Sequence, residues 1–333
     1  MEPKVVVAGR AFPAVPEFLR AEMPEIQVDQ VPLDQLFRSG CNAEVLIPMM
    51  SRITPDLMDR INGLQLIQQW GAGLESVDIE AATSRKIAVA NVPSAGSGNA
   101  ESVAEWCVMA AIALSRRLAE AHDCMRTGHS WGWPCGRGLA GRTAGIIGLG
   151  GVGQALAARL KPFGMRLIAL KRRPDAALRG RLGIDWIGTP DRLPDLLRLS
   201  DYVFLCVALT DQTRSMIDEA AFAMLPPGAC IINASRGAVI DQEALCHHLT
   251  SARLLGAALD VYDFEPFDHQ SPLLNRKNLL ATPHIAGVTD ISYSGISHYV
   301  AANIRRFIKG ELIANCVNQN RISTSLSHAQ REG

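Results

Sequence analysis

Three polar residues in the last third of the chain have the types and the spacing to do chemistry together. Arg236, Glu265 and His284 each follow a short apolar run that is typical of a buried strand. If these runs are neighbouring strands of a parallel sheet, their carboxyl ends meet at one edge, which is where open α/β sheets bind ligands. We therefore expect the three side chains to share one site.

The three side chains suit the reduction of a 2-oxo acid. That reaction needs a cation for the substrate carboxylate, a proton donor for the carbonyl oxygen and a hydride from a cofactor. Arg236 offers a planar fork for a carboxylate, and His284 is the natural acid or base because imidazole titrates near neutrality. Glu265, if hydrogen-bonded to His284, would favour the imidazolium. Taken singly, each residue would more often make a surface ion pair, a turn or a strand cap.

A glycine-rich loop is the expected site of the cofactor's pyrophosphate. Gly148–Gly153 matches GxGxxG, follows the apolar run 144–147 and opens a helical stretch. Gly148 would permit a tight turn, Gly150 would let the backbone approach the pyrophosphate, and Gly153 would let the helix pack closely on the strand. The start of the helix would offer N–H groups and the positive end of its dipole.

The residues after the next strand bear on which cofactor is used. The run 167–170 ends in Lys171, Arg172 and Arg173, and no acidic residue appears before Asp175. An NAD site would place an acid here for the ribose hydroxyls, whereas cations suit the 2′-phosphate of NADP. We expect NADP(H) to be preferred, with NAD as the alternative. The alternative without a function is that the three cations simply form a solvated basic turn.

The elements that must position these residues follow an α/β pattern, with short apolar runs alternating with helical stretches. Turn residues at 91–98 precede a long helix from Asn99 to about Met125, and a second long helical segment covers 289–308. Two long helices around a block of strand–helix units predict one domain inserted into another. We expect a substrate domain of residues 1–98 and 287–333, flavodoxin-like, and an inserted dinucleotide-binding domain of residues 99–286, both Rossmann-like.

The expected strands are short. In the substrate domain they cover 5–8, 45–48, 66–69 and 88–90, and in the cofactor domain 143–148, 166–170, 202–208, 229–233, 255–261 and 279–282.

Composition narrows the class of protein. A chain of 333 residues exceeds the usual single core, so two domains are expected. Lys plus Arg and Asp plus Glu number 33 each, so charge favours no nucleic-acid or membrane partner. The eight cysteines form no metal-ligand cluster, which predicts no metal site and reduced thiols in the cytoplasm. We expect no signal peptide and no membrane span.

Several segments, in this order, resemble the D-isomer-specific 2-hydroxyacid dehydrogenase family. The resemblance implies the roles argued above for Arg236, Glu265 and His284. It also implies a homodimeric enzyme, similar to glyoxylate or hydroxypyruvate reductases, that interconverts a small 2-oxo acid and the D-2-hydroxy acid. The matching segments are Gly71–Gly73, Val103–Glu105, Gly145–Gly153, Ile232–Asp241, Ala258–Pro266 and Thr282–Gly287.

The resemblance implies further site residues. Asp260 would contact the nicotinamide carboxamide, and Thr213 would lie beside the cofactor. The full cofactor set is Gly148, Gly150, Gly151, Val152, Gly153, Lys171, Arg172, Arg173, Val207, Thr213, Ala234, Asp260 and Gly287. The backbone of Gly71, Ala72 and Gly73 would help to grip the substrate carboxylate. Trp70 and Met49 match pocket-lining positions, although such residues are as often part of a core.

The chain departs from the family pattern in a few places. Lys171 replaces the acid of NAD-using members, the segment Cys206–Leu209 lacks the proline often found after that strand, and Glu75-Ser76 stands where Asp-Asn is usual. Two other functions stay open. A cofactor-sensing, corepressor-like interaction protein shares the fold, but the short tail and the intact Arg, Glu and His argue for an enzyme. Formate dehydrogenase chemistry resembles the chain less, because that enzyme pairs its histidine with glutamine.

Overall fold

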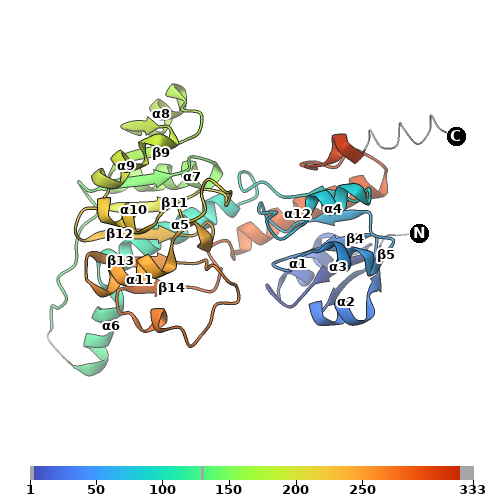
Figure 1. The fold of residues 1–333 in the computed structure, drawn as a ribbon, viewed down its shortest axis with the longest axis horizontal. Helices are drawn as coiled ribbons and strands as arrows, with labels where there is room; N and C mark the ends of the chain where they lie inside the picture. The colour runs from blue at the N-terminus through green and yellow to red at the C-terminus, as the bar shows by residue number, and fades with distance from the viewer. Residues whose placement is uncertain (1–3, 129–130, 323–333) are drawn as a thin grey trace. The chain divides into compact units, whose positions relative to one another are not determined.

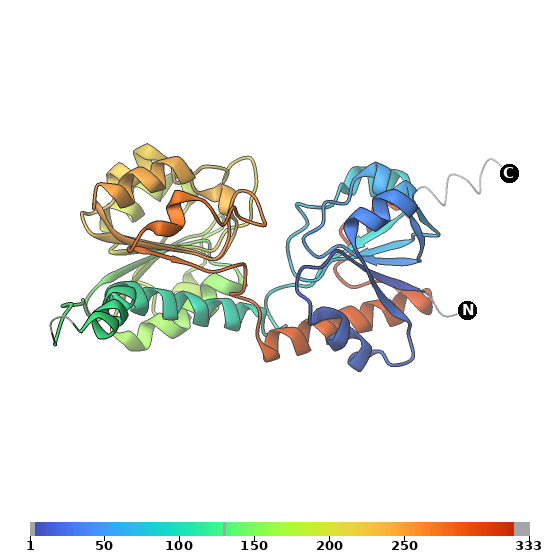
Figure 2. The same ribbon diagram turned by 90° about the horizontal axis from the view of Figure 1, so that it is seen from below.

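The part of the chain that the structure describes forms two units, and each unit is built around its own large parallel sheet. The structure is a computed structural model, and it describes residues 4–128 and 131–322. Unit 1 consists of Met1–Asn99 and Asp290–Gly333, and unit 2 consists of Ala100–Thr289. The second unit is therefore inserted between two segments of the first. Figures 1 and 2 show the elements of each unit.

Unit 1 is a five-stranded sheet with helices on both faces. Its strands run in the order β2-β1-β4-β6-β7, all parallel, which is the flavodoxin-like order. Helices α1 and α12 cover one face, and α2, α3 and α4 cover the other. The elements are β1 (Val5–Ala8), α1 (Val15–Glu22), β2 (Val28–Val31), α2 (Leu33–Ser39), β3 (Cys41–Asn42), β4 (Val45–Ile47), α3 (Pro55–Asp59), β5 (Ile61–Asn62), β6 (Leu66–Gln68), α4 (Ile79–Ser84), β7 (Ala88–Ala90) and α12 (Asp290–Ile308), with β3 and β5 forming a separate pair.

Unit 2 contains a seven-stranded parallel sheet in the order β10-β9-β8-β11-β12-β13-β14. The order reverses between β8 and β11, which makes this the doubly wound arrangement that binds dinucleotides. The elements are α5 (Asn99–Ser115), α6 (Leu118–Thr127), β8 (Thr143–Ile147), α7 (Gly151–Leu160), η1 (Lys161–Phe163), β9 (Arg166–Leu170), α8 (Ala176–Leu182), β10 (Trp186–Gly188), η2 (Pro190–Arg192), α9 (Leu193–Leu199), β11 (Tyr202–Leu205), α10 (Glu219–Met224), β12 (Ala229–Asn233), η3 (Gly237–Val239), α11 (Gln242–Thr250), β13 (Leu254–Leu259), η4 (Pro272–Asn275) and β14 (Leu279–Ala281).

The helices of unit 2 form a layer on each face of its sheet (Figure 2). Helices α5, α7 and α8 pack on one face through residues such as Trp106 and Leu156, and α9, α10 and α11 pack on the other through residues such as Phe222 and Leu245. The central strands are buried from end to end, as expected for a parallel sheet that is covered on both faces. The expected α/β fold class is confirmed.

One expected element differs. The helix predicted from Asn99 to about Met125 is two helices, because the backbone at Arg117 turns left-handed with φ +51°. No glycine or proline lies at this break, so the sequence carries no helix-breaking residue to mark it. Within the described ranges, no helix is both long enough and apolar enough to span a membrane.

Candidate active site

The glycine loop lies between β8 and α7 in the geometry that a pyrophosphate site requires. Gly148 has φ +98°, and a Cβ there would lie 2.5 Å from the carbonyl oxygen of Cys206. A Cβ at Gly153 would lie 2.1 Å from the carbonyl oxygen of Gly148, so the first turn of α7 packs directly on the loop. A Cβ at Gly150, the N-cap of α7, would meet nothing within 4 Å. The space beside Gly150, at the start of α7, is therefore free of protein atoms, as an anion bound at a helix N-terminus would require.

The basic turn after β9 lies next to this loop. Lys171 donates a hydrogen bond from Nζ to the carbonyl oxygen of Leu149, at 3.3 Å. Arg172 and Arg173 are exposed. Asp175, the first acid after the strand, caps α8 by accepting hydrogen bonds from the backbone N–H groups of Ala177 and Leu178. The turn is therefore electropositive, and its nearest carboxylate in sequence is engaged with a helix end.

The loop after β11 lies at the same edge of the sheet and contains Val207 and Thr213. The hydroxyl of Thr213 donates to the carbonyl oxygen of Ala208 at 2.8 Å and accepts from the N–H of Thr210 at 2.8 Å. Thr213 therefore closes this loop on itself.

Arg236 lies in a turn that Asn233 builds at the end of β12. The fully buried Asn233 side chain donates from Nδ2 to the carbonyl oxygen of Arg236 at 2.9 Å and accepts from the N–H of Ser235 at 3.0 Å. A Cβ on the next residue, Gly237, would lie 1.9 Å from the carbonyl carbon of Tyr262. The Arg236 loop therefore packs directly against the loop that follows β13.

Glu265 and His284 form a hydrogen-bonded pair. Nδ1 of His284 lies 2.7 Å from Oε2 of Glu265, and the other carboxylate oxygen, Oε1, accepts from the N–H of Tyr262 at 2.9 Å. The side chains are partly exposed, 33% for His284 and 17% for Glu265. A carboxylate on Nδ1 favours the tautomer or imidazolium with a proton on Nδ1, so Nε2 is the nitrogen that can exchange a proton with a substrate.

Asp260 is engaged with the chain itself. Its carboxylate accepts hydrogen bonds from the Thr282 hydroxyl at 2.6 Å and from the N–H groups of Ile285 and Ala286, both at 2.8 Å. The residue is 1% exposed, and burial raises the pKa of its carboxyl. The contact with a nicotinamide carboxamide that the family resemblance implies stays a prediction.

The expected substrate residues all belong to unit 1. Gly71 has φ +109°, and its carbonyl oxygen accepts from the N–H of Val92, which fixes the loop after β6. Trp70 packs edge-on against Tyr293 in the unit's core, with ring centroids 5.5 Å apart. Met49 is 3% exposed and belongs to the same core. Ala72 and Gly73 continue the loop on the surface.

Sequence reasoning missed the residues that hold the site in place. Asn233 supports the Arg236 turn, Tyr262 anchors Glu265, and Thr282 bonds to Asp260. An asparagine at a strand end is a known turn former, which is the one signal that could have been used. The Tyr262 contact uses a backbone N–H, which any residue but proline supplies, and the Thr282 contact links segments that follow two different strands, so neither leaves a mark on local sequence.

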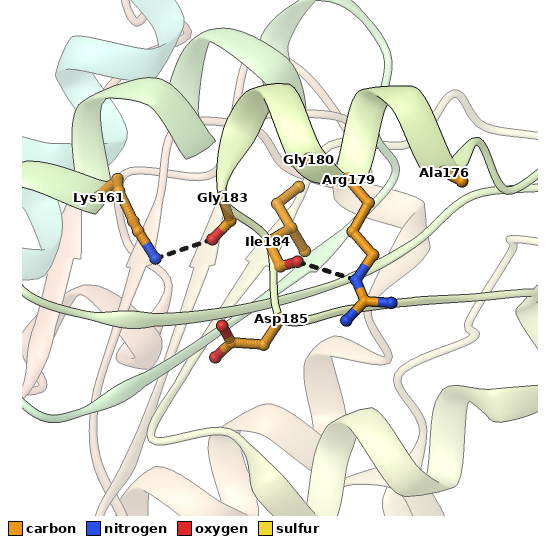
Figure 3. Close-up of a pocket in the computed structure, with 7 residues that line it drawn as sticks. All are labelled: Lys161, Ala176, Arg179, Gly180, Gly183, Ile184 and Asp185. Carbon is orange, nitrogen blue, oxygen red and sulfur yellow. Dashed lines mark hydrogen bonds between the residues drawn. The ribbon is translucent and has the colours of Figure 1, made fainter.

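A separate pocket opens at the opposite, amino-terminal edge of the unit 2 sheet, between η1 and α8 (Figure 3). Its cations are engaged with the carboxyl end of α8, where Lys161 donates to the carbonyl oxygen of Gly183 at 2.8 Å and Arg179 to that of Ile184 at 3.3 Å. The pocket contains none of the expected site residues. Among the residues that the structure describes, no three His, Cys, Asp or Glu side chains are grouped so as to hold a metal ion.

Comparison with known proteins identifies the family. Residues 108–286 match the family model "D-isomer specific 2-hydroxyacid dehydrogenase, NAD binding domain". The glyoxylate reductase of Thermococcus litoralis is 35% identical over 283 residues, which are 82% of this chain and 83% of that protein.

Two solved structures show the same fold over nearly the whole chain. The TT0316 protein from Thermus thermophilus has a TM-score of 0.81 at 30% identity, covering 94% of this chain and 99% of that one. The apo form of D-lactate dehydrogenase from Escherichia coli has a TM-score of 0.79 at 27% identity, covering 93% and 99%. The chain therefore belongs to the D-isomer specific 2-hydroxyacid dehydrogenase family and is an oxidoreductase with a nicotinamide cofactor.

Proposed function

We propose that the protein reduces a small 2-oxo acid, of the glyoxylate or hydroxypyruvate type, to the D-2-hydroxy acid and catalyses the reverse reaction, with NADPH preferred. The observation that carries the proposal is the 2.7 Å contact between Nδ1 of His284 and Oε2 of Glu265. A histidine oriented in this way is a general acid for a carbonyl oxygen. The similarity to a glyoxylate reductase supports the substrate class.

Each residue of the catalytic set has one task. In the reduction, Nε2 of His284 gives its proton to the substrate carbonyl oxygen, and in the oxidation the neutral imidazole takes the hydroxyl proton. Glu265 stabilises the imidazolium and holds the ring by Nδ1. Arg236 binds the substrate carboxylate through two parallel N–H donors, which orients the carbonyl group.

The residues present fit a dinucleotide. The loop Gly148–Gly153 and the first turn of α7 would hold the pyrophosphate, because Gly150 borders open space and the helix start offers N–H donors. Lys171, Arg172 and Arg173 would pair with the 2′-phosphate. When bound, the reduced nicotinamide supplies the hydride. The remaining cofactor contacts are assigned to Gly151, Val152, Val207, Thr213, Ala234, Asp260 and Gly287.

Residues 1–98 with 287–333 are proposed to act as the substrate domain, and residues 99–286 as the dinucleotide-binding domain. Within the former, the backbone of Gly71–Gly73 would contact the substrate carboxylate, and Trp70 and Met49 would limit the size of its side chain. The left-handed backbone at Gly71 supports this assignment, because such a turn exposes successive N–H groups.

We also propose a cytoplasmic homodimer. Cytoplasmic location is supported by the eight cysteines, all of them within the described ranges and free of disulfides. A dimer is supported by large apolar side chains that lie exposed along one stretch of unit 2, a pattern that often marks an interface. They are Met109, Ile112, Leu118, Met125, Trp131 and Trp133.

A panel of 2-oxo acids, each assayed with NADPH and with NADH, tests the function. We expect NADPH consumption with glyoxylate and hydroxypyruvate, and loss of turnover in His284→Ala with cofactor affinity nearly unchanged. His298→Ala is the matched control, because His298 pairs with Glu22 at 3.0 Å on the surface of unit 1. Cofactor binding without turnover of any 2-oxo acid would instead support a corepressor-like protein, and a strong preference for NADH would refute the assignment of the basic turn.

A further inference from the structure

Two consecutive carbonyl groups of the loop after β6 are held by one neighbouring segment. The carbonyl oxygen of Gly71 accepts a hydrogen bond from the N–H of Val92 at 2.9 Å, and that of Ala72 accepts from Nδ2 of Asn91 at 2.7 Å. Asn91 and Val92 directly follow β7, which pairs with β6 in the sheet of unit 1. Both carbonyl groups therefore point towards the segment 91–92.

The direction of these carbonyl groups fixes the direction of two N–H groups. A peptide unit is planar and trans, so its C=O and N–H bonds point in opposite directions. The N–H of Ala72 shares a peptide unit with the carbonyl group of Gly71, and the N–H of Gly73 shares one with that of Ala72. Both N–H groups therefore point away from the segment 91–92. Neither of them donates to another group within the described ranges of the chain.

Two successive N–H groups that point to one side of the backbone form a concave site for an anion. The chain enters this conformation at Gly71, whose φ of +109° favours glycine. Ala72 is exposed and Gly73 is half-buried, so the surface of unit 1 presents the loop to solvent. The anion that the proposed substrate offers is its carboxylate.

We infer that Asn91 is a positioning residue for substrate binding: its amide holds the peptide unit between Ala72 and Gly73 so that the N–H of Gly73 is aimed at the substrate carboxylate. This inference rests on the proposed function. Asn91 acts through the loop, because Nδ2 lies on the carbonyl side of that peptide unit, opposite to the N–H. The position requires a donor, and an aspartate of the same shape would set two acceptors against each other.

The backbone of Asn91 is held independently of its side chain. β7 lies at one edge of the sheet, and the chain after α12 returns to this edge. Ala90 forms an antiparallel bridge with Cys316, and the N–H of Asn91 donates to the carbonyl oxygen of Asn315 at 3.4 Å. A substitution of Asn91 should therefore remove the bond to Ala72 and leave the end of β7 in place.

Steady-state kinetics of Asn91→Asp and Asn91→Leu with glyoxylate and NADPH test the role. We expect KM for glyoxylate to rise roughly 3- to 10-fold in Asn91→Leu, from one missing hydrogen bond. In Asn91→Asp it should rise about 10-fold or more, because the carboxylate repels the carbonyl group of Ala72. In both variants kcat should change by less than about 3-fold, as for the loss of uniform binding. KM for NADPH should stay unchanged, since the assigned cofactor residues belong to unit 2.

Oxamate gives a readout that needs no turnover, because it carries the same carboxylate as glyoxylate but is not reduced. Its Kd for the complex of enzyme and NADPH, measured by titration calorimetry, should rise by the same factor as KM for glyoxylate. Asn62→Leu is the matched control: Nδ2 of Asn62 donates to Oδ1 of Asn42 at 3.1 Å, on the exposed pair of β5 and β3 in the same unit. It should leave every constant unchanged.

Three results would overturn the inference. They are a KM for glyoxylate within about 2-fold of the wild type in both Asn91 variants, equal rises in KM for glyoxylate and for NADPH, and a fall in kcat with KM unchanged. The second would mean general damage, and the third would mean that Asn91 serves the chemical step. Inactivity of the wild type on every 2-oxo acid would overturn the proposed function, whereas an active wild type with unaffected Asn91 variants would overturn this inference alone.

Discussion

His284 and Glu265 are 19 positions apart in the chain, yet Nδ1 of one lies 2.7 Å from Oε2 of the other. Their loops follow β13 and β14, which are neighbouring parallel strands with Leu259 opposite Ala281. The pairing of these two strands therefore brings the acid and the base together. A change at either side chain should affect the chemistry far more than it affects the fold.

Replacing Glu265 with glutamine should lower kcat roughly 10- to 100-fold while leaving the fold intact, because the amide can still bond to the imidazole but no longer stabilises its charge. Glu265→Ala should be worse, since the ring loses its anchor. Steady-state kinetics with glyoxylate and NADPH measure both. Glu22→Gln, in the surface pair with His298, should behave like the wild type. A wild-type rate in Glu265→Gln would remove Glu265 from the catalytic set.

Replacing Lys171 with aspartate should reverse the cofactor preference. The new carboxylate would repel a 2′-phosphate and accept hydrogen bonds from the ribose hydroxyls of NADH. We expect KM for NADPH to rise about 10-fold or more and KM for NADH to fall. Lys161→Ala removes a cation at the opposite edge of the sheet, where it bonds to the carbonyl oxygen of Gly183, and should change neither value. Equal effects of both variants would mean that general charge, not the site, sets the preference.

Gly237→Ala should destabilise unit 2 and reduce activity together. Its Cβ would lie 1.9 Å from the carbonyl carbon of Tyr262, so the loops of Arg236 and Glu265 would have to move apart. Overpacking of this kind costs about 1–3 kcal/mol, measurable as a lower denaturation midpoint. Gly180→Ala is a control of opposite sign, because a Cβ there meets nothing within 4 Å inside helix α8 and should stabilise by about 0.5–1 kcal/mol.

The cysteines should differ sharply in reactivity. Burial raises the pKa of Cys230 to about 12, so at pH 8 the folded protein holds almost none of its reactive thiolate. Cys135 is exposed. Iodoacetamide at pH 8 should therefore label Cys135 first and Cys230 only after denaturation, as read by peptide mass spectrometry. Rapid labelling of Cys230 in the native protein would contradict its burial in the sheet.

Charge placed among the exposed apolar side chains of unit 2 should dissociate the proposed dimer. Met109 and Leu118 are both exposed, and a glutamate at either position would have to be desolvated in an interface. Light scattering after size exclusion should give twice the chain mass for the wild type and the chain mass for the variants. Leu312→Glu is the control, because Leu312 is exposed in unit 1. A monomeric wild type would refute the dimer.

The sheets could be predicted from sequence where burial on both faces produces an uninterrupted apolar run, as in β8 or β12. Two strands of the main sheets escaped prediction, β2 (Val28–Val31) and β10 (Trp186–Gly188), as did the short pair β3 and β5. β2 and β10 lie at sheet edges and are only partly buried. The sequence of β2 is Val-Asp-Gln-Val, so two polar residues interrupt its apolar run. Burial, not intrinsic strand preference, created the signal that the prediction used.

The candidate site divides in the same way. Arg236, Glu265 and His284 could be singled out because each follows a strand and has a side chain with obvious chemistry. The hydrogen bonds that Asp260 accepts from the segment 282–286 could not be predicted. They depend on the register of β13 against β14 and on the left-handed backbone at His284. Asp260 could be assigned from sequence only by the role that the family resemblance implied.

The close contact between Gly237 and Tyr262 has a bearing on protein engineering. The loops after β12, β13 and β14 are joined in series, the first pair by this contact and the second by the bonds of Asp260. An insertion in one of these loops would displace the loops that are joined to it. We therefore expect fusions and circular permutation at this edge of the sheet to destabilise the protein. The turn around Gly310, after α12, is closed by local bonds, from the N–H of Gly310 to the carbonyl oxygen of Phe307 and from the N–H of Glu311 to that of Arg306. It is a better site for attaching a reporter domain.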